Sequence, residues 1–524
     1  MDWSMCTTVM GLGLYETGSS TTSSWMLAKA RLHEERSLPR RPASKSFNVP
    51  SLDQDDVSTV WVLEETDRML LCGGGGRRHS DYRAEVSVAG RVPEGEAAVH
   101  FSETFRESED CCCQSVYFSF SMAAPESDSE CLFSLDPYHV SEELGFILPD
   151  PLEELPPYYQ PWMDIALHVP ELVHSHKLRL HINEMPLLSI QFLQIHSELR
   201  LAHLALSAMT MGYVWQEGRT TRWRYLWMLP HNLAVPYWEV SQRLGLPPIL
   251  THADAVLANW KKKDPDGNLE LLVSLPGGDS VRGFFMVTLL VELAAVPALR
   301  VWRHRAVATA LEEISQSMQD MTDALKLMHD YVDPSVFYGI MRIYLSGWKD
   351  NTSMPKGLVY EGVQEEPMEY SGGSAAQSSL LHCFDELLGI KHEEKSGEFL
   401  TRMRNYMPPA HKQLIQDISL QPSLKGFVQQ QASERLNQAF QHCVKKLLAL
   451  RSYHINVVSR YITVPAARAR QLRNQSQESK QEMISRAPTA LEERGTGGSG
   501  IMSFLKTVRN QTKDTLLPET GKKK

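Results

Sequence analysis

The chain has 524 residues, which suggests roughly two to four domains. Hydrophobic residues make up 42% and charged residues 22%, values that exclude a collagen-like chain, a fully disordered chain and a disulfide scaffold. The formal net charge of −10 provides no overall attraction to nucleic acid or to an anionic membrane, and we expect neither as a partner.

The first part of the chain, residues 1–135, differs from the rest. It holds Ser-rich runs, a run of four glycines at Gly73–Gly76 and six of the eight cysteines, including the triplet Cys111–Cys113. Its two strand-like stretches, VSTVWVL and AEVSVAG, are too few for a core. We therefore predict a disordered or unassigned extension over residues 1–135. The remaining two cysteines, Cys383 and Cys443, are typical of a reduced, intracellular protein, and without a secretory signal we expect a cytoplasmic location.

Helical periodicity becomes frequent from Pro137 onward. Residues 195–215 predict a buried helix, residues 311–328 a long helix with one apolar face at 3-4-3-4-3 spacing, and residues 439–461 a further helix. The apolar run 283–299 contains Glu292 and Pro297 and is shorter than the roughly 20 residues that a membrane span needs, so we expect a buried core helix. Strand-like alternation is scarce. The sequence thus predicts a mainly α protein in which helices pack on helices.

Loops are predicted around Pro156, at DPDGN (264–268), from Ser371 and at the glycine run from Gly495, with a polar and mobile stretch over about 471–500. DPDGN lacks the spacing and the closing Glu of a calcium loop, so we interpret it as a turn. The basic runs 261–263 and 219–224 are interpreted as solvated surface. The GGSAA sequence around Ser374 is a weak match to a hydrolase nucleophile turn, because Ala376 stands where that pattern needs a glycine.

Two residues carry a chemical hypothesis on pattern alone. His454 projects from the apolar face of its predicted helix, so it is either a satisfied core histidine or an axial haem ligand with Arg451 one turn away. Arg342 lies among aromatic residues, where it either binds a carboxylate in bidentate fashion or meets the end of a helix. The pattern leaves both alternatives open.

Several longer motifs are more specific. They include LRSYHINVV, FYGIMRIYLSGWK, GLVYEGV, EYSGGSAAQSS, FDELLGI, MRNYMPPAH, VLANWKKKDPDG and RGTGGSGIMSFLKTVR. From about Pro137 to the C-terminus the chain closely resembles the indoleamine 2,3-dioxygenases. Segments such as MPLLSIQFL, GYVWQEG and MHDYVDP are most similar to the second, low-activity vertebrate paralogue.

The resemblance implies a two-domain helical haem dioxygenase. A small α-rich domain would cover residues 136–276 and a large all-helical haem-binding domain residues 277–524, with the boundary near Pro276–Gly278. The implied cofactor is haem b. The implied reaction opens the indole ring of L-tryptophan, or of a related indoleamine, with molecular oxygen to give N-formylkynurenine, the first step of the kynurenine pathway. A reductant would keep the iron ferrous, and no acid or base residue is required.

The resemblance also implies roles for individual residues. His454 would be the proximal iron ligand, and Arg451 and Asp385 the paired charges beside it. The expected substrate-binding residues are Arg342, which would hold the carboxylate, Phe284 and Phe337, which would pack on the indole, Ser374 and Ala375 at the edge of the haem, and Thr496 in a closing glycine loop.

Three positions depart from the high-activity paralogue, namely His252, Ala255 and Thr288, and the two that belong to the expected substrate site are His252 and Thr288. Such changes are worth roughly 1–3 kcal/mol, or about 10–200-fold, in an apolar pocket, and we therefore expect weak binding of tryptophan. The segments 219–230 and 297–311 also look irregular. The alternative function is a catalytically weak haem protein that acts as a signalling or immunomodulatory scaffold, with Tyr158, Tyr159 and Tyr360 as candidate phosphorylation sites.

Overall fold

The computed structural model describes residues 47–48, 134–216, 227–264, 267–301, 306–351, 354–431, 433–475 and 500–518. The predicted extension lies outside the described residues except at 47–48 and 134–135, as do Arg219, Arg222 and Arg224, Thr496 and nearly all of the loop over 471–500. All described residues belong to one compact unit. The predicted domain boundary near Pro276–Gly278 stays a prediction.

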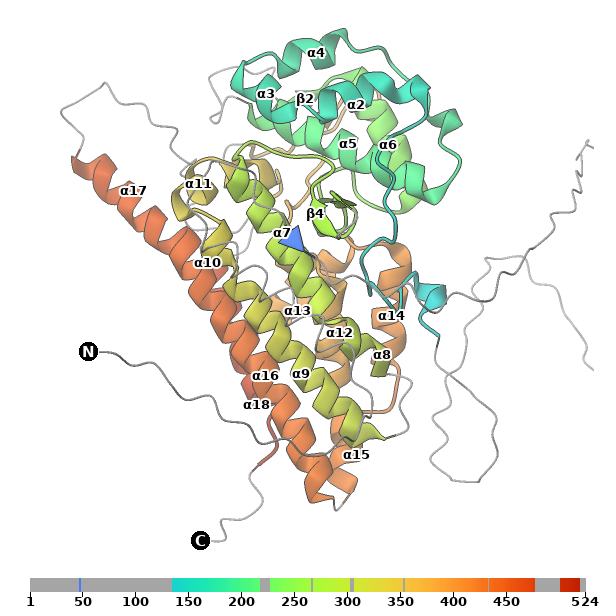
Figure 1. Cartoon of the computed structure of the whole chain (residues 1–524). Coiled ribbons are helices and arrows are strands. Elements are labelled where there is room, and N and C mark those ends of the chain that lie inside the picture. Colours follow the sequence, from blue (N-terminus) through green and yellow to red (C-terminus); the bar gives the residue numbers. More distant parts are fainter. Residues whose placement is uncertain are drawn as a thin grey trace, which may run out of the picture. The chain divides into compact units, whose positions relative to one another are not determined.

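The first half of this unit is built around one helix, α5. Its elements are η2 (Asp136–Tyr138), η3 (Pro157–Tyr159), α2 (Gln160–Ala166), α3 (Val169–His174), α4 (Leu178–Glu184), η4 (Ile190–Phe192), α5 (His196–Trp215), α6 (His231–Leu244) and the π-helical turn η5 (Ala253–Leu257). Helix α5 starts where the Glu198 carboxylate accepts hydrogen bonds from the backbone N–H groups of Gln194 and Ile195, at 2.7 and 3.2 Å. The shorter helices α2, α3, α4 and α6 pack around it (Figure 1). The helix predicted over 195–215 is confirmed.

The second half is a bundle of longer helices. Its elements are α7 (Asp279–Ala294), α8 (Val296–Arg300), α9 (Val307–Lys326), α10 (Met328–Tyr331), α11 (Pro334–Gly339), η7 (Met341–Leu345), η8 (Ala375–Gln377), α12 (Ser379–Leu388), α13 (Glu394–Arg404), α14 (Pro409–Ser419), α15 (Leu424–Gln430), α16 (Glu434–Val458), the π-helical turn η9 (Ser459–Thr463), α17 (Val464–Gln475) and α18 (Ile501–Asp514). Helix α9 buries Leu311, Ile314, Met318 and Met321 and packs against both α7 and α16. The amphipathic helix expected from 311 onward is confirmed, as is the mainly α class.

The expected helix at 439–461 begins earlier, at Glu434, because the Ser433 hydroxyl accepts a hydrogen bond from Leu436 N and caps the first turn. It then continues without a break into η9. This gives the bundle one long helix that reaches from the lower end of the unit to α11.

Helix α7 carries the most apolar run. The stretch Asp279–Arg300 is long and apolar enough to cross a membrane by length and composition, but 67% of its most apolar window is buried inside the fold. A core helix, as expected, accounts for this burial. At Gly283 a Cβ atom would lie only 2.4 Å from the backbone oxygen of Tyr331, so glycine is what lets α10 approach α7 closely.

Strands are few and short in the described ranges. β4 (Asn268–Glu270) pairs antiparallel with both β1 (Phe47–Asn48) and β3 (Lys261–Lys262), and β2 (Met228–Leu229) pairs in parallel with β5 (Val359–Tyr360). The sequence between β3 and β4 is the predicted turn, in which Asp264 O accepts a hydrogen bond from Gly267 N at 3.1 Å.

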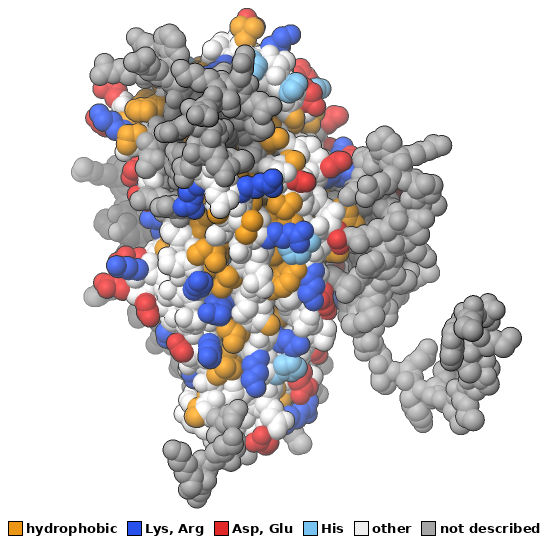
Figure 2. Space-filling view, turned by 90° about the vertical axis from the view of Figure 1, so that its left-hand side faces the viewer, with side chains coloured by type: hydrophobic (Ala, Val, Ile, Leu, Met, Phe, Trp, Pro, Cys, Tyr) orange, Lys and Arg blue, Asp and Glu red, His pale blue; other side chains and the backbone are white. Residues whose placement is uncertain are grey.

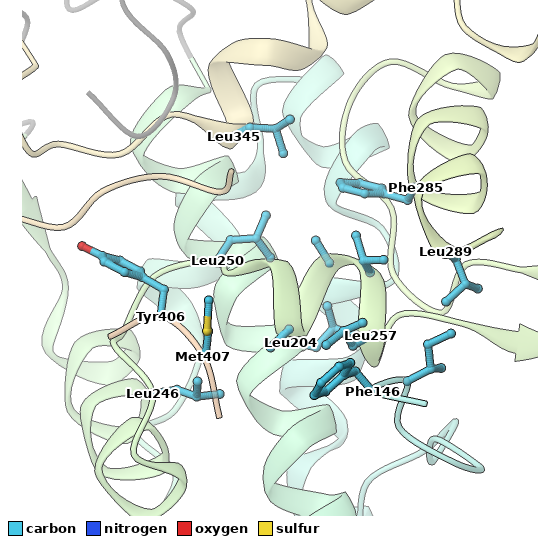
Figure 3. Packing of buried hydrophobic residues seen from close by; sticks show 14 of the residues in the cluster. Phe146, Leu204, Leu246, Leu250, Leu257, Phe285, Leu289, Leu345, Tyr406 and Met407 are labelled. Carbon is cyan, nitrogen blue, oxygen red and sulfur yellow. The ribbon is translucent and has the colours of Figure 1, made fainter. Parts of the chain in front are cut away.

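One continuous apolar core joins the two halves. Figure 3 shows Leu204 of α5 and Leu257 of η5 close to Phe146. Phe285 and Leu289 of α7 lie to the right of them in this view. On the face shown in Figure 2, side chains of both charge signs lie among apolar ones, as expected of a mildly acidic chain.

Candidate active site

The centre of the candidate site is His454 on α16. Residues Leu447, Leu450, Val457 and Tyr461 form the buried stripe of this helix and its continuation, and His454 lies on the same stripe. Burial, followed by the nearby Arg451 charge, lowers the pKa of His454 to about 4. The imidazole is therefore neutral near pH 7, which is the form that binds a metal. Its side chain nevertheless stays partly exposed.

A charged network lies one turn from His454. Arg451 Nη2 is 2.5 Å from Asp385 Oδ1, and the other carboxylate oxygen lies 2.9 Å from His392 Nε2. Burial by itself raises the pKa of Asp385, but Arg451 and His392 outweigh it, so that the pKa is lowered overall. The predicted Arg451–Asp385 pair is thus present, although its role beside a cofactor stays a prediction.

The C-terminal helix α18 completes this network. His392 Nδ1 lies 2.8 Å from Gln511 Oε1, and Arg451 also donates to the Thr512 hydroxyl. The sequence did not predict these contacts. His392, Gln511 and Thr512 had no recognisable signal, since each becomes meaningful only through a partner distant in sequence.

An apolar wall is provided by α7. Most of its residues are buried, but Phe284, Thr288 and Val291 stay partly exposed at positions i, i+4 and i+7, one helical stripe. The Thr288 hydroxyl donates to the Phe284 carbonyl at 2.8 Å, so it is already used within the helix. The Phe284 and Phe337 rings lie 5.1 Å apart, and Phe337 meets Tyr461 edge-on at 5.9 Å. The two predicted indole-packing residues are therefore brought together and are linked to the helix that carries His454.

Arg342 lies in η7, immediately after α11. It is fully buried, and its guanidinium carbon lies 5.8 Å from the centre of the Tyr338 ring. Arg342 lies in a 3-10 turn and not at the end of an α-helix, and this argues against the alternative in which it only meets a helix dipole. Binding of a carboxylate by Arg342 stays a prediction.

His252 is engaged in a buried network rather than standing free. Its Nε2 lies 2.9 Å from Glu292 Oε1, and the same oxygen accepts a hydrogen bond from the Ser378 hydroxyl at 2.7 Å. Glu292 follows Thr288 by one turn of α7, so the network closes the lower end of the α7 stripe. The sequence marked Glu292 only as a charge within an apolar run, and that isolated charge was the available signal for it. Ala255 is buried in η5, the π-helical turn that begins directly after His252.

The loop 371–378 carries Ser374, which is partly exposed, and Ala375, which is exposed. Its backbone is held by hydrogen bonds from Ser371 N to the Tyr406 hydroxyl at 2.7 Å and from Gln377 Nε2 to Gly372 O at 3.0 Å. The Ser374 hydroxyl accepts a hydrogen bond from Ala376 N at 3.2 Å. Ser374 therefore caps its own turn, which does not support a nucleophile.

These residues suit a haem. Within the described ranges no group of three or more His, Cys, Asp or Glu side chains could hold a metal ion. A single neutral imidazole such as His454 is sufficient only where a porphyrin supplies the other iron ligands. The partly exposed apolar stripe of α7 offers side chains on which such a ring could pack, and Arg451 offers a cation for a carboxylate at its rim. Thr496 lies outside the described residues.

Comparisons with known proteins identify the family of the chain. A family model described as indoleamine 2,3-dioxygenase matches residues 134–515. The chain is 51% identical to human indoleamine 2,3-dioxygenase 2 over 403 residues, which cover 74% of this chain and 97% of that protein. It is 44% identical to rat indoleamine 2,3-dioxygenase 1 over 401 residues, 73% of this chain and 96% of the relative. A protein named myoglobin from Haliotis madaka is 38% identical over 391 residues, 72% of this chain and 97% of the relative. The resemblance predicted from the motifs is confirmed.

Proposed function

Because the chain belongs to the indoleamine 2,3-dioxygenase family, we propose that it opens the indole ring of L-tryptophan with molecular oxygen to give N-formylkynurenine. The proposed cofactor is haem b, which when bound supplies the oxygen binding and the redox chemistry. The proposal includes a reductant that keeps the iron ferrous, a cytoplasmic location and no nucleic-acid or membrane partner.

The observation that carries this proposal is the environment of His454. It is a neutral imidazole on the inner stripe of α16, partly exposed, with the Arg451–Asp385 pair one turn away. We assign it the proximal position. The Arg451 guanidinium would meet a propionate, held in place by Asp385 on one side and by Thr512 on the other.

The substrate roles follow from the other wall. Phe284 and Phe337 would pack on the indole, and burying this ring would hold it in one orientation. Arg342 would bind the carboxylate of the amino acid. Ser374 and Ala375 would border the opening, and closure of the loop around Thr496 would exclude water. No general acid or base is assigned, since the proposed reaction requires none.

We further propose that tryptophan binds weakly. The His252 ring is held by its hydrogen bond with Glu292, and Thr288 is a bulkier residue than the serine expected at this position of the α7 stripe. A mismatch of this size in an apolar site corresponds to roughly 10–200-fold in kcat/KM between substrates. The measurement is the KM for L-tryptophan in parent and Thr288→Ser proteins. Saturation of the parent at micromolar tryptophan would contradict the proposal.

The test of the activity uses the full chain purified with haem. After reduction, L-tryptophan and oxygen are added and N-formylkynurenine is followed, with His454→Ala as the variant. His442→Ala is the matched control, because His442 is an exposed histidine on the same helix. We expect product from the parent and the control, and loss of both the haem spectrum and the product in His454→Ala. Product from a His454→Ala protein that keeps its haem would refute the proximal assignment.

A second candidate function is reversible oxygen binding without turnover, which the relative named myoglobin favours. A stable ferrous oxygen spectrum that does not change when tryptophan is added would support it.

The scaffold alternative depends on which of the three candidate tyrosines a kinase could reach. Tyr159 and Tyr360 are both fully buried, and the Tyr360 hydroxyl donates to Pro248 O at 2.6 Å, whereas Tyr158 is 40% exposed. A phosphorylation-dependent role would therefore rest on Tyr158. If a Tyr158→Phe variant kept every partner-dependent effect, this would rule out the phosphorylation-dependent role.

A further inference from the structure

Four basic side chains converge on the side of the fold away from His454, and we call them the cationic cluster. They are His139, which follows η2, His196 and Arg200 on the first turns of α5, and His411 on α14. Helix α14, on the right of Figure 1, packs directly against η2. None of the four takes part in the proposed active site.

Ring contacts and electrostatic interactions connect the four side chains. The His139 and His196 rings lie 5.7 Å apart, edge to face. The His411 ring interacts with the His139 backbone and packs at 4.8 Å against Phe146, which Figure 3 shows at the edge of the core beside Leu204 and Leu257. Arg200 lies close enough to influence the protonation of both His196 and His411.

The cluster has two buried and two exposed members. Arg200 and His411 are only 4% exposed, whereas His139 and His196 are exposed to solvent. Solvent therefore reaches the cluster at His139 and His196.

Arg200 is incompletely satisfied. Its Nη2 donates to Ala253 O at 2.8 Å, but its buried Nε has no acceptor. The nearest acid is Asp254 on η5, and its two oxygens already accept hydrogen bonds from His203 and from Thr251 N and Oγ1. Among the described residues no carboxylate forms an ion pair with Arg200. Asp254 attracts the Arg200 charge without forming an ion pair with it, so the buried Nε–H of Arg200 still lacks an acceptor.

The two neighbouring imidazoles are hard to protonate. Burial first, and then the Arg200 charge, lowers the pKa of His196 to about 4 and that of His411 to about 3. Both rings are thus neutral near pH 7 and can each accept a proton once negative charge enters the cluster. The groups that face this space are the three histidines, Arg200 and Asp254, together with the neutral Ser379 hydroxyl, 3.5 Å from His411 Nδ1.

From this geometry we propose that the cationic cluster binds a small tetrahedral oxyanion of the phosphate and sulfate class. The anion would accept hydrogen bonds from Arg200 and from imidazole rings that take up a proton as it binds. It would connect η2, α5 and α14 through a single ligand, and so stabilise the packing of these three elements. This inference does not depend on the proposed dioxygenase activity.

The test is isothermal titration calorimetry, which measures the affinity of the full-length, haem-loaded protein for sulfate. Sodium sulfate is compared with sodium chloride at the same ionic strength. Sulfate keeps its charge between pH 6.0 and 7.5, so any change in affinity reports on the protein. Uptake of one proton per anion predicts an affinity that rises about tenfold for each pH unit of acidification. Repeating the titration in buffers of different ionisation enthalpy counts the protons. Inorganic phosphate and a sugar phosphate are then compared at pH 6.0 to distinguish the free ion from a phosphate monoester.

Two variants decide the location. His196→Gln removes an exposed ring that the fold does not need, and we expect at least about tenfold weaker binding with a flatter pH dependence. His174→Gln is the control, because His174 is an exposed histidine at the end of α3. An equal response to sulfate and chloride would overturn the proposal. So would unchanged sulfate binding in His196→Gln, or an equal loss in both variants.

Discussion

The side chain of His382 offers a direct test of how the fold holds the loop over the candidate site. It lies on α12 and is 3% exposed. Its Nε2 is 2.8 Å from Ala376 O, which can only accept, and its Nδ1 is 3.2 Å from Arg404 Nε, which can only donate. The ring is therefore a neutral Nε2–H tautomer with both nitrogens in use. Burial is the main reason that the pKa of His382 is lowered to about 4.

This shift makes stability depend on pH with a definite sign. In the unfolded chain His382 titrates near the ordinary value of about 6.5. As the pH falls below that value, the unfolded state gains a proton that the folded state does not accept until about pH 4. The folded state therefore loses stability as the pH falls, by about 2 kcal/mol from this one residue at pH 5. Above the unfolded pKa the penalty is absent.

The informative substitution is His382→Gln. An amide can donate to Ala376 O and accept from Arg404 Nε, so it reproduces the neutral tautomer without titrating. We expect the variant to be close to the parent or slightly less stable at pH 7, and to gain about 2 kcal/mol relative to the parent between pH 7 and pH 5. The assay is urea unfolding followed by circular dichroism at both pH values. With a slope of about 3 kcal/mol/M or more, the relative shift of the midpoint is up to about 0.7 M. Parallel pH dependence in the two proteins would refute the reasoning.

Two further predictions concern the walls of the site. Asp385→Asn breaks the buried pair with Arg451 and should cost about 3 kcal/mol at pH 7, measured as a fall in the unfolding midpoint. Because the pKa of Asp385 is lowered in the fold, this difference should disappear as the pH falls below about 4, and a constant difference down to acid pH would contradict it. Gly283→Ala places a Cβ against the Tyr331 carbonyl and should destabilise by about 1–3 kcal/mol in a thermal melt. Gly426→Ala, whose Cβ would meet only ordinary contacts, should not destabilise, and an equal loss in both variants would show that crowding at α10 is not the cause.

The main helices could be predicted because their periodicity is local. The spacing of Leu311, Ile314, Met318 and Met321 is enough to define the buried face of α9, and any partner helix would pack against this same face. The same logic placed His454 on the inner side of α16. The resemblance to a known family then supplied the residues that the periodicity could not join, such as Phe284 and Phe337, which are distant in sequence but 5.1 Å apart in the fold.

Polar networks were harder to predict, since a polar residue gives no periodic signal. His392 and Gln511 are 2.8 Å apart and fix the orientation of Asp385, yet neither has a neighbour in sequence that indicates a partner. Their position follows only after α18 has packed beside α16. Such contacts are specified by tertiary packing, and a single sequence carries no record of the pairing.

The case of His252 shows how this limits a residue-by-residue transfer of function. By resemblance it replaces an aromatic side chain at the substrate site, and the natural expectation is that its ring lines the apolar wall. In the fold the ring is 5% exposed and its Nε2 meets Glu292, which the Ser378 hydroxyl also contacts. A buried carboxylate has to be hydrogen-bonded, and on an apolar helix few donors lie within reach. For Glu292 these donors are His252 and Ser378. We therefore expect the substitution at position 252 to act through Glu292 as much as through shape, because the carboxylate holds the imidazole.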